Sequence, residues 1–301
     1  AMDLDIDPRG ATKQFYDAVI IANLKNKYTR PPDWVGELKY DSQTATPLEL
    51  MPSDQGKLRL WLHPKSSTEV PFSKNTAGAD LSWGTGATPS CLSMMNARTG
   101  NKFLEYVSAH ITPVEAANYF VALCRLFKDA EGTGARLIWE LQGPGIVFSR
   151  RVLDLSYLNI YWREVEDALG KIRDNKMRPG WIPNPRSIMA LHSEYWDALR
   201  EKKTINPSWE ALDETLNFVF SSGSIEYRGK KLADSDDPSA SRVHHGDITV
   251  ADALSWKIGK DDWKPKVEEQ EKTFYDLRTF GGRMAIAESM RVEDDCLAWN
   301  D

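Results

Sequence analysis

The compact part of the hydrophobic pattern begins near Asn75 and predicts short strands alternating with helices. Three mostly apolar segments joined by short turns predict an antiparallel meander: 75–80, 89–96 and 102–109. Thr112-Pro-Val-Glu115 combines a capping box with proline at the first helical position, so a helix is predicted to start there and to end near Gly132. The nearly all-apolar run from Ala135 to Leu141 then predicts a buried parallel strand after this helical crossover.

The later pattern is mainly helical. Helices are predicted over residues 146–153, 185–202, 208–218 and 247–258, with a strand near residues 159–161. A hairpin is predicted around Arg228-Gly229, between strands at 224–227 and 230–232. Three antiparallel strands, a helix and a parallel strand that ends in an acid form a ribonuclease H-like order. We therefore predict an α/β fold with a mixed β-sheet flanked by helices.

Three regions are expected along the chain. Residues 1–74 are predicted to be an N-terminal extension or linker, because a proline-rich stretch follows one short helix within residues 11–28. Within it, alternation at Leu58, Leu60 and Leu62 predicts a single edge strand. Residues 75–260 are predicted to form the ribonuclease H-like domain, and residues 261–301 an acidic C-terminal tail.

Composition limits the function classes without selecting one. The chain has 301 residues, 41% of them hydrophobic, no apolar run long enough to span a membrane and no visible secretory signal. Its three cysteines are far apart, which favours a reducing compartment without a zinc site. The net charge of −6 is unusual for a nucleic-acid binder, but residues 261–301 hold eleven acidic and six basic residues and so contribute −5. A locally basic DNA surface on the rest of the chain is therefore compatible with the charge.

Three acids occupy unusual places beside turns. Asp80 ends an apolar strand, Glu140 ends another just before Gln142-Gly-Pro-Gly145, and Asp247 opens the last helix. Acids from separate elements that converge on two divalent ions are what two-metal phosphodiester cleavage requires, and carboxylate oxygens suit Mg²⁺ or Mn²⁺. The alternative is three unrelated acids, of which Asp247 simply caps its helix.

Three segments carry a resemblance to a known family. Gly78-Ala-Asp80-Leu-Ser-Trp-Gly, Ile138-Trp-Glu140-Leu-Gln-Gly-Pro-Gly145 and His245-Gly-Asp247-Ile-Thr-Val-Ala-Asp252 resemble the nuclease domain of tailed-bacteriophage terminase large subunits. The resemblance covers about residues 75–260. In that family an ATPase motor precedes the nuclease, and no Gly-x-x-x-x-Gly-Lys-Ser/Thr phosphate loop occurs here. Since the opening Ala1-Met2 also looks like a cloning remnant, we expect a piece of a longer chain whose upstream motor is missing.

The resemblance implies a site, an activity and partners. Asp80, Glu140 and Asp247 would be the catalytic and metal-binding acids, which hold two Mg²⁺ or Mn²⁺ ions. Asp252 lies 140° around the helix from Asp247, which favours a supporting position or a helix-surface acid over direct co-ligation. His244 and His245 would ligate a metal, orient a phosphate or form a polar loop pair. The implied reaction is metal-dependent endonucleolytic cleavage of concatemeric viral DNA during genome packaging, in the cytoplasm of the infected bacterial host.

Double-stranded DNA is the implied substrate, and the phage portal and the small terminase subunit are the implied partners. Candidate contacts to the DNA backbone are six basic residues, each with a solvated charged surface as the alternative: Arg150, Arg151, Arg186, Arg228, Lys230 and Lys231. Two other functions stay open at this point. One is a non-catalytic module that docks on the portal, and the other is a different ribonuclease H-like nuclease such as a resolvase.

Overall fold

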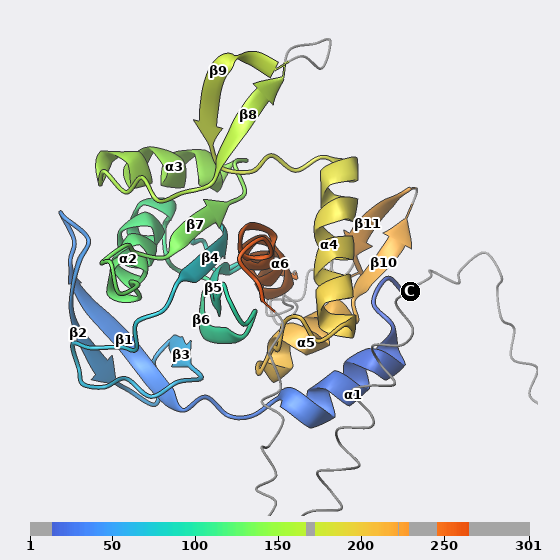
Figure 1. The fold of residues 1–301 in the computed structure, drawn as a ribbon, viewed down its shortest axis with the longest axis horizontal. Helices are drawn as coiled ribbons and strands as arrows, with labels where there is room; N and C mark the ends of the chain where they lie inside the picture. Colours follow the sequence, from blue (N-terminus) through green and yellow to red (C-terminus); the bar gives the residue numbers. More distant parts are fainter. Residues whose placement is uncertain (1–13, 167–171, 222, 229–245, 265–301) are drawn as a thin grey trace, which may run out of the picture. The chain divides into compact units, whose positions relative to one another are not determined.

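The computed structural model describes residues 14–166, 172–221, 223–228 and 246–264, all of which belong to the unit Ala1–Lys264. Its centre is a seven-stranded mixed sheet in the order β2-β1-β3-β6-β5-β4-β7 (Figure 1). Only the β4–β7 pair is parallel, and the other neighbours run antiparallel. The strands are β1 (Trp34–Asp41), β2 (Thr46–Pro52), β3 (Leu58–Leu60), β4 (Asn75–Asp80), β5 (Ser90–Asn96), β6 (Lys102–Ser108) and β7 (Arg136–Trp139).

This order confirms the predicted α/β fold class and the predicted ribonuclease H-like succession of elements. β4, β5 and β6 form the antiparallel meander, and α2 (Pro113–Leu126) carries the chain across to β7, which pairs parallel with β4. Thr112 and Glu115 form the predicted capping box at the start of α2. The sequence therefore located four adjacent strands of the sheet correctly, from β6 to the edge strand β7.

Helices cover both faces of the sheet. Figure 1 shows α2 and α3 (Pro144–Asp154) on one side of β4 and β7, and α6 (Asp247–Gly259) on the other. Helices α4 (Pro185–Arg200) and α5 (Trp209–Thr215) pack against α6, and α1 (Ala18–Tyr28) packs against α5; in Figure 1, α4 is to the right of α6 and α5 and α1 are below. Two hydrophobic clusters match these layers, because one contains the buried side chains of α2 and the other those of α4 and α6.

The prediction of a linker with one edge strand is wrong for residues 34–60. These residues form β1, β2 and β3, and β3 lies inside the sheet between β1 and β6. Leu38, Leu50, Leu58 and Leu60 are all buried in the core beneath α2. Two of the prolines that suggested a linker, Pro47 and Pro52, lie on β2, the outermost strand, where proline is compatible with a sheet, and the others of this stretch lie outside the strands.

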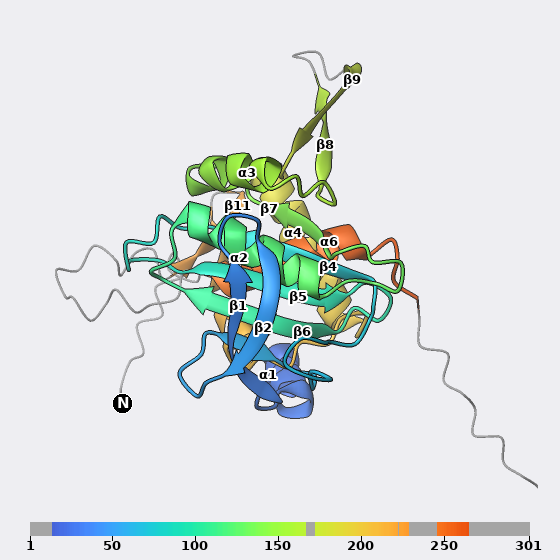
Figure 2. The same cartoon turned by 90° about the vertical axis from the view of Figure 1, so that its left-hand side faces the viewer.

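Two hairpins also differ from the sequence prediction. Strand β11 (Ser224–Tyr227) pairs with β10 (Phe218–Ser221) across a turn at Gly223, and the predicted partner at 230–232 lies outside the described residues. Strands β8 (Trp162–Glu166) and β9 (Ile172–Pro179) form an unpredicted hairpin that extends away from the sheet beside α3 (Figures 1 and 2). Residues 159–161 form no strand and make one isolated parallel bridge, Leu137 to Ile160.

Candidate active site

Asp80 and Glu140 meet at one edge of the sheet because their strands are parallel neighbours. Ala79 on β4 is paired with Trp139, the last residue of β7, and each acid is the next residue along the chain. The carboxyl ends of parallel strands lie at the same sheet edge, and neighbouring strands are roughly 4.8 Å apart. The register therefore brings Asp80 and Glu140 level with each other.

Asp247 reaches this edge because α6 lies directly on β4. A Cβ atom added to Gly78 would overlap the carbonyl O of Ala251 and the amide N of Ser255, so only glycine lets the helix backbone approach the strand this closely. Asp247 is the first residue of α6, and Gly246 before it adopts the left-handed conformation at φ 83°. The glycine two residues before Asp80 thus determines where Asp247 is placed.

The three acids influence one another electrostatically. Burial raises the pKa of Asp80 well above its usual value, and the negative charges of Asp247 and Glu140 raise it further. Glu214 on α5 also contributes, and burial together with Asp247 raises the pKa of Glu214 itself. Four carboxyl groups therefore form one cluster, in which each negative charge makes the next ionisation harder.

The acids open into a cavity of about 920 Å³. Its walls combine the three acids with apolar and aromatic side chains from α4 and the segment before it, from β10 and β11, and from α6. These side chains include Trp181, Ile188, Leu191, His192, Phe218, Ile225, Tyr227 and Val250. A concave space with a few converging polar groups is the usual form of a ligand site.

The donor set of Asp80, Glu140 and Asp247 suits a hard divalent cation by its chemistry, because all the donors are carboxylate oxygens and a cation would offset their mutual repulsion. Within the described ranges, however, no three Asp, Glu, His or Cys side chains are already arranged to hold a metal ion. His244 and His245 lie outside the described residues. The metal-ligand role of the trio therefore stays a prediction.

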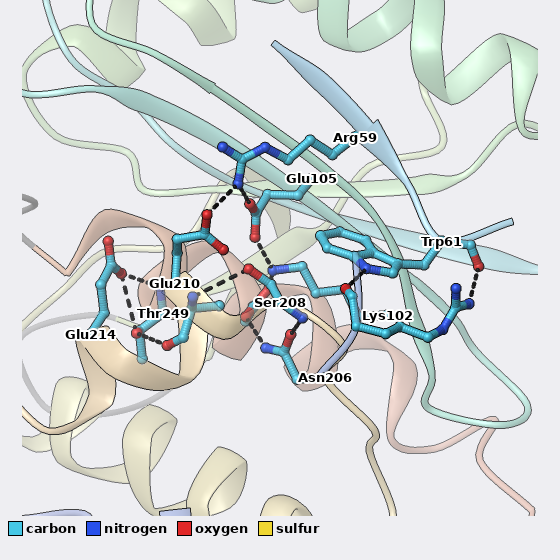
Figure 3. Close-up of polar contacts among 12 residues, drawn as sticks. Arg59, Trp61, Lys102, Glu105, Asn206, Ser208, Glu210, Glu214 and Thr249 are labelled. Carbon is cyan, nitrogen blue, oxygen red and sulfur yellow. Dashed lines mark hydrogen bonds and ion pairs between the residues drawn. The ribbon is translucent and has the colours of Figure 1, made fainter. Parts of the chain in front are cut away.

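Asp252 is not a helix-surface acid. Its side chain is fully buried, and its Oδ1 lies 2.8 Å from Nζ of Lys102, which is also fully buried. Asn206 Nδ2 donates to Asp252 Oδ2 at 2.6 Å, and Tyr195 OH donates to the same oxygen at 3.3 Å. Lys102 also pairs with Glu105 at 2.7 Å (Figure 3). Asp252 therefore ties the middle of α6 to β6 and to the segment before α5.

The predicted basic residues fall into different environments. Arg228 is exposed and lines the cavity, and Arg186 is exposed at the start of α4. Arg150 is exposed on α3, whereas Arg151 donates from Nε to Asn118 Oδ1 at 2.7 Å and from a terminal nitrogen to two loop carbonyls. Lys230 and Lys231 lie outside the described residues. Arg151 is thus engaged in packing α3, and Arg228 is the candidate that shares the cavity with the acids.

Fold and cluster together define an α/β domain of ribonuclease H-like order with acids grouped at the carboxyl edge of its parallel strands. A search of solved structures finds large terminase nuclease domains from thermophilic phages, which is the class of domain that the sequence motifs resemble. The nuclease of phage G20c is 16% identical, with 79% of this chain and 97% of that chain covered and a TM-score of 0.48. The nuclease domain of Thermus phage P74-26 is 15% identical, with 82% and 99% covered and a TM-score of 0.47.

A third structure, the G20c nuclease with bound magnesium, is 16% identical, with 81% and 97% covered and a TM-score of 0.45. No family model and no curated protein sequence matches the chain. Because all three TM-scores are below 0.5, the likeness assigns neither an activity nor site residues to this chain. Among the helices of the described residues, none combines the length and the apolar character that crossing a bilayer requires.

Proposed function

We propose that this chain is a metal-dependent DNA endonuclease. The observation that carries the proposal is the convergence of three carboxyl groups, those of Asp80, Glu140 and Asp247, at the wall of a large cavity. The negative charges of Asp247 and Glu140 raise the pKa of Asp80. Folding the chain so that like charges meet is unfavourable unless a cation binds there. Carboxylates from different elements that share divalent ions are the usual arrangement for phosphodiester hydrolysis.

Each acid has a distinct position in this scheme. Asp80, between the other two elements, would contact both ions, and Glu140 and Asp247 would each complete the ligands of one. Bound divalent ions would supply an activated water nucleophile and stabilise the leaving oxygen. Arg228 at the cavity wall would orient a backbone phosphate through its guanidinium.

The proposed biological role rests on the resemblance of the sequence motifs to terminase nuclease domains. We propose that the substrate is concatemeric viral DNA and that the portal and the small terminase subunit are the partners, in the cytoplasm of the host. The acid cluster favours a nuclease over a non-catalytic docking module, because a docking surface does not require like charges from three separate elements to converge at one cavity.

Plasmid cleavage tests the activity directly. The chain is incubated with supercoiled DNA in Mn²⁺, in Mg²⁺ and in EDTA. We expect nicked and linear products with a divalent ion only. Asp80→Asn, Glu140→Gln and Asp247→Asn should each abolish cleavage. Asp197→Asn, which changes an exposed acid paired with Arg200 on α4, should leave it intact. Cleavage that survives EDTA would refute the metal mechanism.

A further inference from the structure

Within the part of the chain that the structure describes, the residue that precedes α6 provides no side-chain cap for its N-terminus. A helix begins with four backbone N–H groups that need acceptors, usually supplied by a Ser, Thr, Asp or Asn just before it. Here that position is Gly246, which has no side chain to accept them. The acceptor comes instead from another helix: the Thr249 backbone N–H donates to Oε2 of Glu214 on α5 at 3.0 Å (Figure 3).

The Glu214 side chain is buried and hydrogen-bonded at the N-terminus of α6. Glu214 is only 3% exposed, and the Thr249 hydroxyl donates to Glu214 Oε2 at 3.3 Å, the oxygen that also accepts the Thr249 backbone N–H. A buried carboxyl group is costly unless hydrogen bonds compensate for lost water, and here the backbone N–H and the positive end of α6 both favour it. The same group is electrostatically coupled to Asp247 and Asp80. Glu214 therefore touches the first turn of the helix whose first residue is a site acid.

We propose that Glu214 is a positioning residue for Asp247. By capping α6 from α5, it fixes the first turn of the helix so that the Asp247 carboxyl group faces Asp80 and Glu140. Asp252 ties α6 to Lys102 further along the helix, so Glu214 controls the end that reaches the site. The consequence for metal binding rests on the proposed nuclease function, whereas the effect on the helix does not.

Two simpler roles compete with this proposal. Glu214 could contribute to stability alone, or it could be a fourth ligand of the metal. Glu214→Gln separates them, because an amide oxygen still accepts the Thr249 N–H but binds a divalent ion poorly. Glu214→Ala removes the acceptor altogether. Glu210→Gln is the matched control, since Glu210 is on the same helix and its carboxyl group contacts Arg59 at 3.1 Å, away from α6.

The first readout needs no metal. Amide hydrogen exchange of the metal-free full chain is followed at Thr249 and Val250. Losing a cap typically corresponds to about a 5–30-fold change in local opening. We expect exchange to accelerate by about that factor in E214A and to stay near the wild-type rate in E214Q and E210Q. If E214A does not fold, Glu214→Asp, one methylene shorter, replaces it. Unchanged exchange in the variant lacking the acceptor overturns the positioning role.

The second readout is the affinity for Mn²⁺ by titration calorimetry. We expect the dissociation constant to rise about tenfold in E214A and to change less than about threefold in E214Q. Equal losses in both variants would identify Glu214 as a ligand and overturn the proposal. Faster exchange with unchanged affinity would show a plain stabilising cap and also overturn it. A wild-type chain that binds no Mn²⁺ refutes the proposed metal site instead, and exchange at Thr249 still decides whether Glu214 holds the helix.

Discussion

Replacing Gly78 by alanine should disable the site more than it destabilises the fold. The added Cβ atom would lie closer than 3.0 Å to two backbone atoms of α6, the carbonyl O of Ala251 and the amide N of Ser255. Neither atom can rotate away, so the helix must move off β4. Overpacking of this kind costs about 1–3 kcal/mol, offset by about 0.4–1 kcal/mol from the less flexible unfolded chain. The expected net loss is about 1–2 kcal/mol.

The same movement displaces Asp247 from Asp80. A misplacement of about 1 Å in a catalytic arrangement can reduce the rate about 100-fold. The assay compares thermal unfolding with plasmid cleavage in Mn²⁺. Gly259→Ala is the control, because it lies on the same helix–strand interface but its Cβ would make its closest contacts with the Thr76 side chain, at 3.2 and 3.3 Å, and would lie an ordinary 3.8 Å from Ala97 Cα. Gly78→Ala should lower the melting temperature by about 2–8 °C and cleavage about 100-fold, whereas the control should stay close to wild type. Wild-type cleavage by Gly78→Ala would refute the link between helix packing and site geometry.

Three further predictions concern charge and the C-terminal tail. The raised pKa of Asp80 means that the metal-free native state holds this proton more tightly than the unfolded chain does, so stability should fall as the pH rises above about 4. Asp80→Asn should flatten that fall in a pH series of melting temperatures, and an unchanged slope would contradict it. Lys102→Met should cost about 3–5 kcal/mol in urea unfolding because two buried carboxyl groups lose their shared cation. Asp252→Asn should cost less unfolding free energy than Lys102→Met, because Lys102 and Glu105 remain as an ion pair with no net charge. Equal costs for the two variants would be evidence against this ion-pair scheme. We expect the acidic tail to dock on a partner and to take no part in the chemistry, so deleting residues 265–301 should preserve cleavage and the melting temperature. A collapse of stability on this deletion would contradict that expectation.

Asp80 and Glu140 could be located from the sequence because simple rules govern parallel strands. An apolar run that ends in an acid, after a helical crossover, places that acid at the carboxyl edge of the sheet. Two such runs on neighbouring strands bring their acids together whatever the details of packing. Asp247 was recognisable because a helical pattern starts at the acid itself. Secondary-structure signals were therefore sufficient for the principal site candidates.

Glu214 and the role of Asp252 depend on tertiary packing that no local pattern contains. Glu214 lies in a seven-residue helix, too short for its periodicity to show that an acid faces inward. Asp252 lies among buried residues of α6, but only the fold brings Lys102 next to it. Charges that meet across elements distant in sequence are visible only once the strands and helices are assembled.

The missed strands have a different cause. The β8–β9 hairpin pairs with no strand of the seven-stranded sheet, and its sequences, WREVE and IRDNKMRP, lack the apolar–polar alternation that identifies a half-buried strand. The alternation at Leu58 and Leu60 did predict a strand at β3, but nearby prolines outweighed the apolar positions of β1 and β2, among which Leu38 and Leu50 are buried. Proline on an outer strand is compatible with a sheet, and that position is known only from the topology.

Anomalous diffraction from a crystal of this chain soaked in Mn²⁺ tests the central claim most directly. The account predicts two manganese peaks about 3.5–4 Å apart, with Asp80 in contact with both and Glu140 and Asp247 in contact with one each. The absence of any manganese peak in contact with Asp80 at saturating Mn²⁺ would contradict the assignment of this acid cluster as the metal site.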